Sequence, residues 1–152
     1  DSSLIARRIA QSQSVVCGAP GYFRQHGVPL VPDDLLRHNC LIYSYATSGD
    51  TWRFTGPDTD EAVKVTGNFW ANNGDALRVA ALGGLGVLLT PRFIVCEYLR
   101  SGRLEAVLGD YAVPDLSIYA VYPHNRHLSA KLRVFVDFLV KRFGSMPDWN
   151  GP

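Results

Sequence analysis

Residues 72–91, NNGDALRVAALGGLGVLLTP, decide the fold of this chain. Asn72 and Asn73 can cap the start of a helix, and the small apolar residues that follow form its body. A pair of glycines ends this helix, and the apolar run 85–89 predicts a buried strand. A second helix then starts at Pro91, a residue type that favours the first helical turn. So much backbone turning around one helix start is more typical of a small-molecule binding site than of a catalytic centre.

The start of the first of these helices is the strongest candidate for a binding site. Free N–H groups and the helix dipole at Asn72, Asn73 and Gly74 favour an anion, and the two amides could hold a carboxylate or a polar ring substituent. Asp75 opposes this interpretation, because its carboxylate partly satisfies the dipole and repels a bound anion. A well-capped helix without any ligand is the alternative, and both remain open at this point.

Length and composition describe one ordinary globular domain. The chain has 152 residues, of which 47% are hydrophobic and 19% charged, and its formal net charge is +1. This charge does not favour DNA or an anionic membrane as a partner, and no apolar run reaches the roughly 18 residues of a membrane-spanning helix. The chain begins with Asp1 rather than Met and shows no signal-peptide pattern. We therefore expect a piece of a longer protein that does not enter a membrane.

The cysteines favour a reducing environment. Cys17, Cys40 and Cys96 lie inside apolar segments, and an odd number without a framework spacing does not predict disulfides. None has a cationic sequence neighbour that would favour a reactive thiolate. We expect inert, buried thiols and a cytoplasmic location.

Strand and helix patterns alternate along the chain. We expect strands at residues 2–9, 14–18, 40–45, 51–55, 62–69, 85–89, 104–108 and 117–122, and helices at residues 20–26, 32–38, 76–82, 92–101 and 129–143. The strands at 51–55 and 62–69 form the clearest hairpin, and Ser129 caps the last, amphipathic helix. This alternation predicts an α/β fold around a mostly parallel sheet. The chain would cross between two lobes at Cys17-Gly18 and at Tyr122-Pro123. These crossings suggest a hinge between a central lobe and a second lobe made from the two ends of the chain.

No catalytic or metal site can be assembled from the sequence. His124 and His127 are spaced as a possible metal pair, but no cysteine or carboxylate completes the set and Arg126 repels a cation. No serine lies in a nucleophile elbow, and the acidic residues fall in turns or first helical turns. The glycine-rich run 83–88 follows a helix and precedes a strand, the reverse of a dinucleotide-binding loop. We expect no catalytic residue, no metal and no cofactor.

Six segments of the chain, in the right order and with the right gaps, resemble the effector-binding domain of LysR-type transcriptional regulators. They are DSSLIARRIA, VVCGAPGYFRQHGVP, LLRHNCLIY, NGDALRVAALGGLGVLLTPRFI, SGRLEAVL and YAVYPHNRHLSAKLRVFVDFL. The resemblance runs from Asp1 to about Phe143. It is closest to the subgroup in which V-Y-P-H-x-R-H-L-S-A-K precedes the final helix.

The resemblance implies an α/β fold like that of type 2 periplasmic binding proteins, with two lobes, two crossover strands and a cleft between the lobes. The effector-binding domain would span residues 1–143, and residues 144–152 look like a loose tail. Residues 17–121 would form one complete central lobe, and residues 1–16 and 122–143 would be remnants of the second lobe. The front of that lobe and the family's winged helix-turn-helix would be absent. Sheet edges and apolar surface left exposed in this way favour dimerisation.

The resemblance also implies which residues line the effector site. They stand at the helix start, after the glycine break and at strand ends: Asn72, Asn73, Gly74, Gly86, Val87, Tyr43, Ser44 and Tyr119.

The implied function is that of a small-molecule-sensing module rather than an enzyme. Its partners would be an effector, such as an organic acid or an aromatic metabolite, and further copies of the chain. DNA would be bound only through the missing N-terminal domain, and no membrane is involved. A solute-binding receptor of the same fold is the alternative. A small α/β enzyme is a further rival, but it needs a nucleophile–base or acid–base pair that the sequence does not offer.

Overall fold

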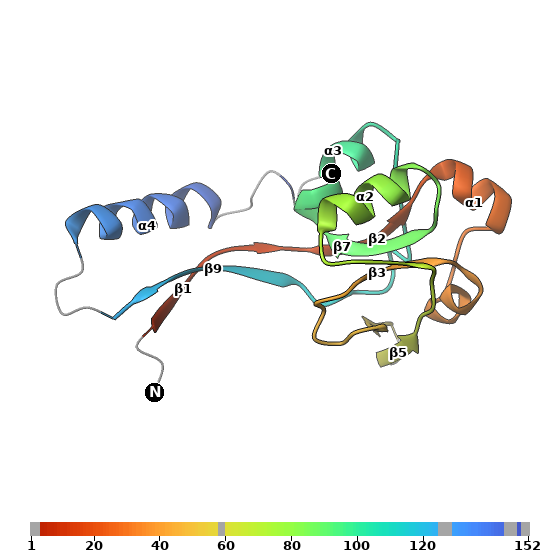
Figure 1. Ribbon diagram of the computed structural model, residues 1–152, viewed down its shortest axis with the longest axis horizontal. Helices are drawn as coiled ribbons and strands as arrows, with labels where there is room; N and C mark the ends of the chain where they lie inside the picture. The colour runs from red at the N-terminus through yellow and green to blue at the C-terminus, as the bar shows by residue number, and fades with distance from the viewer. Residues whose placement is uncertain (1–3, 58–59, 125–128, 145–148, 150–152) are drawn as a thin grey trace.

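The computed structural model describes residues 4–57, 60–124, 129–144 and 149. The chain forms two parts (Figure 1). The body runs from Ser14 to Pro114 and is built on a five-stranded sheet. The arm extends away from the body and consists of β1 (Leu4–Ser12), β9 (Leu116–Pro123) and α4 (Ala130–Phe143).

The body sheet has the strand order β6-β3-β7-β2-β8, with β6 (Phe69–Ala71), β3 (Cys40–Tyr43), β7 (Val87–Pro91), β2 (Ser14–Gly18) and β8 (Glu105–Val107). β6, β3 and β7 are parallel to one another, whereas β2 is antiparallel to both β7 and β8. The predicted mostly parallel sheet is therefore mixed. The reason is that β2 follows directly from the arm and enters at the edge where the parallel strands end, so that Ser14 pairs with Pro91.

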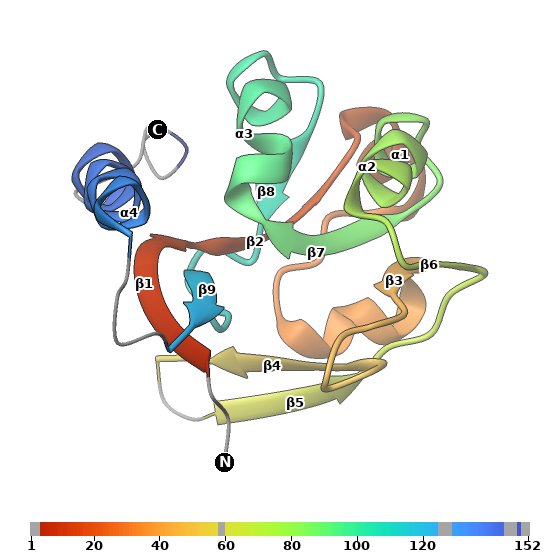
Figure 2. The ribbon, with the colours of Figure 1, turned by 60° about the vertical axis from the view of Figure 1, so that its left-hand side comes forward.

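Helices α2 (Gly74–Leu82) and α3 (Arg92–Arg100) cover one face of this sheet (Figure 2). Their contact with the sheet forms a buried cluster that includes Leu41 and Leu88 from the strands, Leu77 from α2 and Val95 from α3. The strand residues that contribute to this cluster alternate with those that face the other side, as the pleat of a strand requires. The apolar pattern of the sequence thus positions α2 over the centre of the sheet.

The opposite face is covered by a hairpin of β4 (Thr51–Thr55) and β5 (Asp60–Lys64), by α1 (Pro20–His26) and by the 3₁₀ helix η1 (Pro32–Arg37). Val16 and Ile42 of the sheet pack here against Trp52 and Phe54 of β4 and Tyr22 of α1. The two clusters together make a three-layered body with a buried sheet.

Two predicted strands have different limits in the structure because glycines bring backbones into close contact. The hairpin strand expected at 62–69 ends at Lys64, and β6 is a separate strand. A Cβ at Gly67 would lie 1.8 Å from the carbonyl oxygen of Cys40, and a Cβ at Gly86 would lie 2.1 Å from that of Asn39. These contacts turn the chain at Gly67 before β6 and delay β7, which starts at Val87 rather than at residue 85.

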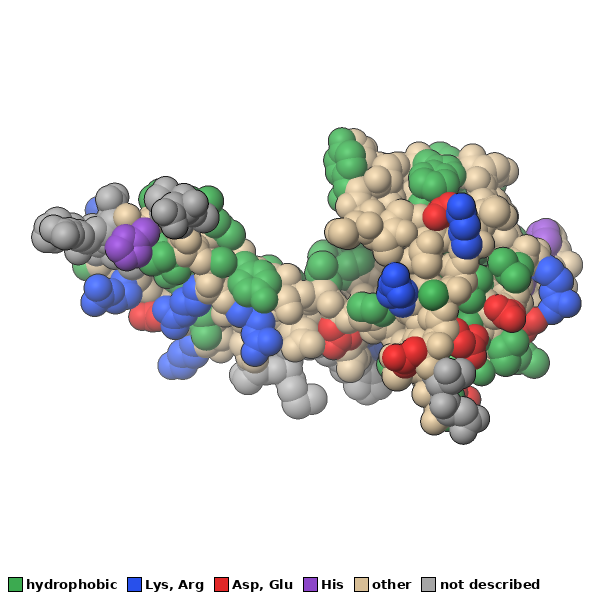
Figure 3. Space-filling model, turned by 90° about the horizontal axis from the view of Figure 1, so that it is seen from below, with side chains coloured by type: hydrophobic (Ala, Val, Ile, Leu, Met, Phe, Trp, Pro, Cys, Tyr) green, Lys and Arg blue, Asp and Glu red, His purple; other side chains and the backbone are tan. Residues whose placement is uncertain are grey.

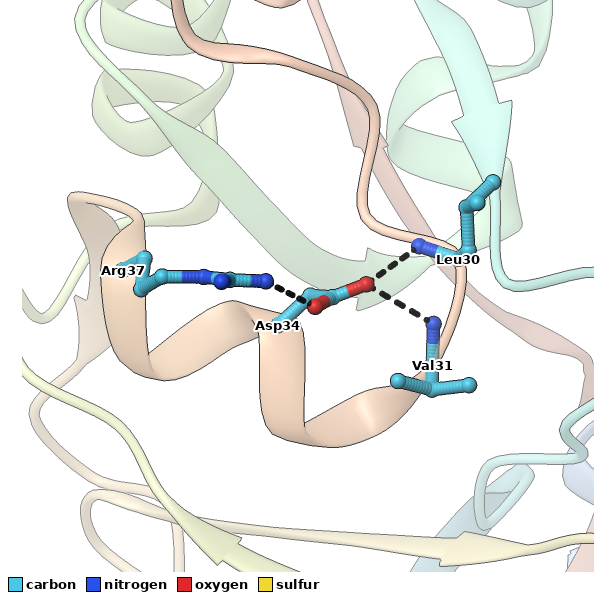
Figure 4. Close-up of polar contacts among 4 residues, drawn as sticks. All are labelled: Leu30, Val31, Asp34 and Arg37. Atoms are coloured by element: carbon cyan, nitrogen blue, oxygen red, sulfur yellow. Dashed lines mark hydrogen bonds and ion pairs between the residues drawn. The ribbon is translucent and has the colours of Figure 1, made fainter.

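The first turn of η1 is held by Asp34 (Figure 4). Its Oδ2 accepts hydrogen bonds from the N–H groups of Leu30 at 2.9 Å and Val31 at 3.2 Å, and its Oδ1 accepts one from Arg37. These contacts, with the two backbone donors first, hold the pKa of the Asp34 carboxyl below its usual value. The acidic residue expected to stabilise a first helical turn therefore does so through direct hydrogen bonds.

The arm is an antiparallel pair of strands with one helix packed on it. β1 and β9 pair from Leu4 with Pro123 to Ser12 with Leu116, with an irregularity between Arg8 and Ala10. Ser129 accepts a hydrogen bond from the N–H of Leu132 at 3.2 Å, which confirms the predicted cap of the last helix. An ion pair of 2.6 Å between Arg7 and Asp137 joins β1 to α4.

The chain passes between arm and body at other places than the sequence suggested. β1 ends at Ser12 and β2 starts at Ser14, so the first passage is Gln13; the second lies between Pro114 and Leu116. The crossings expected at Cys17-Gly18 and Tyr122-Pro123 lie inside strands. Strand patterns do not reveal which sheet a strand joins, and the lobe limits at residues 17 and 121 remain a proposal.

Trp149, the described residue beyond Gly144, contacts both parts of the molecule. Its ring stacks on Phe143 of α4, with 5.6 Å between centroids, and meets Phe93 of α3 edge-on at 6.1 Å. The ring of Trp149 therefore links the arm to the body. The other residues of the expected loose tail, 145–148 and 150–152, lie outside the described residues. None of the helices in the described ranges is long and apolar enough to cross a membrane.

Candidate functional site

A cavity of about 670 Å³ lies in the body at the edge where its parallel strands end. β3 contributes Tyr43 from its last position, β7 contributes Thr90, and α2, which follows β6, contributes Gly74. The carboxyl ends of parallel strands and the helix starts behind them are where α/β proteins bind ligands, and the size suits a small molecule. The lining residues are Ser14, Leu41, Tyr43, Tyr45, Ala46, Thr47, Ser48, Gly49, Thr51, Trp52, Arg53, Gly74, Leu77, Leu89, Thr90, Pro91, Phe93, Ile94, Pro114, Asp115 and Leu116.

The lining is mainly apolar and aromatic. Tyr43 and Tyr45 meet edge-on with 6.3 Å between ring centroids, and Phe93 and Ile94 line the cavity from the start of α3. Trp52 contributes from β4. A ligand that fills this space must therefore present an apolar surface over much of its extent.

The start of α2 carries a side-chain cap and, next to it, an ion pair. The side-chain oxygen of Asn73 accepts a hydrogen bond from the N–H of Ala76 at 3.0 Å, so this oxygen serves as the predicted cap. Asp75 forms an ion pair of 2.7 Å with Arg78 of the same helix. Arg78 thereby offsets part of the negative charge with which Asp75 opposes an anion at this helix start.

Among the described residues that line the cavity, two are charged. Arg53 on β4 has an exposed side chain and forms no ion pair with any described residue. Asp115 accepts a hydrogen bond from Gln11 of β1 at 2.8 Å. On the outer surface, Lys and Arg side chains gather on the arm, while Asp and Glu side chains lie mainly on the body (Figure 3).

The structure brings some of the predicted site residues together and separates others. Tyr43 and Gly74 line the cavity. Asn73 directly precedes Gly74, and Asn72 lies at the same edge, where its amide contacts the hydroxyl of Tyr45 at 3.4 Å. Ser44 follows Tyr43, and its N–H bonds to the carbonyl of Ala71 at the end of β6.

Gly86, Val87 and Tyr119 lie elsewhere. Gly86 and Val87 are at the opposite end of β7, where Gly86 packs against the backbone of Asn39 and Val87 is fully buried. Tyr119 lies in the arm, where it pairs with Arg8 and has an exposed side chain. These three residues therefore do not line the cavity. The sequence showed the glycine break but not which end of the strand would face a ligand.

Sequence reasoning missed Thr90, Arg53, Trp52 and Phe93. Thr90 is only 5% exposed, lines the cavity, and makes no hydrogen bond through its hydroxyl within the described part of the chain. Thr90 is the last residue but one of β7, which runs parallel to β3 and places Thr90 near the end of the sheet where Tyr43 lies. The other three depend on how the hairpin and α3 pack, which no local pattern reveals.

The cysteines and histidines offer no reactive centre near the cavity. Burial raises the pKa of the Cys17 and Cys40 thiols to about 12, which confirms that these two are inert core residues. Cys96 on α3 is only half-buried, so the expectation of burial was too strong there. His124 is exposed, and His127 lies outside the described residues. No group of three or more His, Cys, Asp or Glu side chains in the described ranges could hold a metal ion.

Comparison with known proteins gives one consistent family. Residues 1–144 match the LysR substrate binding domain family. The chain is 33% identical over 142 residues to the HTH-type transcriptional regulator DmlR of Escherichia coli (strain K12), which covers 93% of this chain and 46% of DmlR. It is 31% identical over 147 residues to the HTH-type transcriptional regulator PtxR of Pseudomonas aeruginosa, covering 97% of this chain and 47% of PtxR. The chain spans about half the length of the curated relatives that it matches.

Solved structures agree with this family. The regulatory domain of CrgA, a LysR-type transcriptional regulator from Neisseria meningitidis, superposes with a TM-score of 0.83 at 31% identity, covering 95% of this chain and 71% of that domain. The full-length virulence activator AphB of Vibrio cholerae superposes with a TM-score of 0.81 at 31% identity, covering 93% of this chain and 48% of AphB. Both the resemblance seen in the sequence and the periplasmic-binding-protein-like fold are thereby confirmed. This chain belongs to the LysR substrate binding domain family, the effector-binding domains of LysR-type transcriptional regulators.

Proposed function

We propose that the cavity is the effector site of this domain and that a bound effector changes the position of the arm relative to the body. The observation that carries the proposal is that both passages between the two parts border the cavity. Ser14, just after the first passage, donates a hydrogen bond of 2.7 Å to the carbonyl of Pro114, at the start of the second. Both residues line the cavity. A ligand there contacts the two segments about which the arm can move.

A second contact ties the first passage to the wall of the cavity. The N–H of Arg92 donates a hydrogen bond of 2.7 Å to the carbonyl of Gln13, and Arg92 follows the lining residues Thr90 and Pro91. A ligand that prefers one position of the arm shifts the population toward that position. In a LysR-type regulator, this shift would change how the DNA-binding domain, which precedes the effector domain, holds DNA.

The module would act without catalysis, in the cytoplasm, as part of a transcriptional regulator. The named relatives are transcriptional regulators, and no nucleophile–base pair lies among the described residues that line the cavity. The same relatives favour a regulator over a solute-binding receptor of similar fold. We keep as part of this proposal the central lobe at residues 17–121, the partial second lobe at 1–16 and 122–143, and the tail from residue 144.

We also propose that copies of this chain associate through the outer face of α4. Val134, Phe135 and Phe138 lie on the side of α4 away from the buried Val136, and they are 67%, 56% and 58% exposed. Neighbouring large apolar side chains that are more than half exposed mark an interaction surface. A second copy is the occupant that we propose, because the same patch on both partners can pair about a two-fold axis.

The proposed effector site predicts the result of a nuclear magnetic resonance (NMR) titration. The ¹⁵N-labelled 152-residue chain would be screened against a library of small metabolites, with amide shifts of Gly74, Thr90 and Leu116 as the readout. We expect hits that shift these amides, and we expect Tyr43→Ala to weaken them about tenfold, because Tyr43 supplies aromatic contact area.

Tyr119→Ala is the matched control, since Tyr119 is also an exposed tyrosine on a strand but lies in the arm. It should leave the affinity unchanged. A library that shifts no amide around the cavity, or hits that lose affinity with Tyr119→Ala and not with Tyr43→Ala, would exclude this site.

A further inference from the structure

We infer that Trp149 holds the arm against the body through its contacts with Phe143 and Phe93, here called the clasp, and that the clasp opens when the arm changes its position. This inference rests on the proposed movement of the arm and adds the residue that controls it. Three features of the described chain carry it: the two aromatic partners, a buried donor without a partner, and the place of Phe93 in the cavity wall.

The two aromatic partners of Trp149 belong to different parts of the molecule (Figure 1). Phe143 is the last residue of α4 in the arm, and its ring stacks on the indole with 5.6 Å between centroids. Phe93 is on α3 in the body, and its ring meets the indole edge-on at 6.1 Å. Offset-stacked and edge-on arrangements at such distances are the favourable ones for aromatic rings. One side chain therefore stabilises a fixed position of the arm on the body.

The clasp differs from the links between arm and body at the two passages. There, Ser14 donates a hydrogen bond to the carbonyl of Pro114, and the N–H of Arg92 donates one to the carbonyl of Gln13. Two passages act as the two points of a hinge, about which rotation remains possible. Trp149 adds a third contact, between α4 and α3, which opposes this rotation.

The indole N–H of Trp149 makes the clasp easy to open. Its Nε1 is buried and has no hydrogen-bond partner among the described residues. A buried donor without a partner destabilises the state that buries it, and it regains a hydrogen bond when the ring moves into water. The favourable aromatic contacts are therefore opposed by the unpaired donor. With contributions so opposed, a ligand can shift the population between the held and the released arm.

Phe93 connects the clasp to the cavity. Its side chain is 41% exposed, lines the cavity and also contacts Trp149. A ligand that packs against Phe93 displaces the ring on which Trp149 rests. Filling of the cavity and opening of the clasp are thus linked through one side chain, and such a link is reciprocal. A variant without the clasp should therefore bind the ligand more tightly.

Distances between two spin labels in the unliganded chain test the clasp by itself. Val121→Cys on β9 in the arm and Val79→Cys on α2 in the body would carry the labels, since both side chains are exposed. Cys96→Ser removes the half-buried thiol, and dilution with unlabelled chain restricts the measurement to distances within one copy. In pulsed electron paramagnetic resonance, Trp149→Ala should broaden the distance distribution about twofold, because the arm then samples further positions.

Two further variants separate the clasp from other effects of a lost tryptophan. Trp149→Phe keeps an aromatic ring but has no N–H group, so the distribution should stay as narrow as in the wild type. Trp70→Ala, at an exposed tryptophan on β6 in the body, is the matched control and should also leave it unchanged. An unchanged distribution in Trp149→Ala, equal broadening in Trp70→Ala, or a Trp149→Ala chain that no longer melts cooperatively would overturn the inference.

The metabolite titration distinguishes this inference from the proposed effector site. Hits at the cavity together with an unchanged distribution in Trp149→Ala would leave the site standing without the clasp. A broadened distribution without any hit would retain the clasp and exclude the site. Where both results are positive, Trp149→Ala should bind the hits about threefold more tightly, because the released arm is already populated. Equal or weaker binding would contradict the link through Phe93.

Discussion

His38 is a buried titratable side chain whose hydrogen bond joins α1 to the segment before β3. Its Nδ1 lies 3.1 Å from the hydroxyl of Tyr22, and that hydroxyl accepts a hydrogen bond from the N–H of Asn39 at 3.0 Å. The Tyr22 hydroxyl can therefore donate its own hydrogen to Nδ1 of His38. Such a bond requires an unprotonated Nδ1, as in a neutral imidazole. Burial first, and then repulsion from His26, lower the pKa of His38; nearby Asp34 acts in the opposite direction and Arg37 in the same direction.

This residue predicts a loss of stability in mild acid. Because the pKa of His38 is lower in the folded chain than in the unfolded chain, the unfolded chain binds the proton more readily. The free energy of unfolding therefore keeps its full value above about pH 6.5, the ordinary pKa of histidine. It falls as the pH drops through the lower pKa that His38 has in the folded state. Urea unfolding at a series of pH values measures this decrease in the free energy of unfolding.

The variant His38→Gln should flatten this pH dependence, since glutamine offers an acceptor to Tyr22 but does not titrate. His124→Gln, at an exposed histidine, should retain it. A wild-type chain that keeps its full stability through pH 5 would show that His38 does not control the acid transition.

The two possible roles of the start of α2 can be separated at the scale of the element. Asn73 caps α2 through its side-chain oxygen, whereas the amide of Asn72 donates a long hydrogen bond of 3.4 Å to the hydroxyl of Tyr45. Asn73→Ala should lower the free energy of unfolding by about 1 kcal/mol, the usual effect of removing such a cap. Asn73→Asp should preserve it, and Asn72→Ala should have little effect. Equal losses from Asn72→Ala and Asn73→Ala in chemical denaturation would contradict the capping role.

Two elements show why their limits differ from the sequence pattern. The chain enters β7 only after Gly86 because the backbones of Gly86 and Asn39 touch, with the N–H of Val87 bonded to the carbonyl of Asn39 at 2.9 Å. Gly67 causes the corresponding turn before β6. The apolar run continued through both glycines, so periodicity alone could not show the break. Contact between segments far apart in the sequence decides these boundaries.

At the scale of the whole molecule, the arm is the part that most needs a partner. A two-stranded pair with one helix buries little surface, and such pairs are marginally stable alone. α4 covers one face of the strands through Val136 while Val134, Phe135 and Phe138 remain exposed. We predict a concentration-dependent dimer in sedimentation velocity experiments.

Phe138→Lys should weaken this dimer by at least tenfold, since it places a charge in the apolar patch on α4. Leu36→Lys is the control, because Leu36 is an equally exposed apolar residue on η1, in the body. If Leu36→Lys dissociates the dimer and Phe138→Lys does not, the interface lies on the body instead of on the arm.

The sequence by itself determined the local structure and the family. The cap at Asn73, the turn at the paired glycines, the hairpin, the Ser129 cap and the amphipathic last helix all depend on neighbouring residues, so short patterns predict them. The six segments in order predicted the LysR family, which the match over residues 1–144 confirms. The start of α2 was predicted as a candidate site from its own residues, whereas Tyr43 at the end of β3 was implied by the family resemblance; both line the cavity or lie beside it, and their role as an effector site stays a proposal.

Only the tertiary structure decided which segments meet. It joined β1 to β9 and β2 to the body, displaced the passages to Gln13 and Pro114, and turned Gly86 and Val87 away from the cavity. It also placed Thr90 in the wall of the cavity, 5% exposed and with no hydroxyl partner among the described residues. Pairing of strands and burial of a polar group depend on distances through space, and a period of two or 3.6 residues carries no information about them.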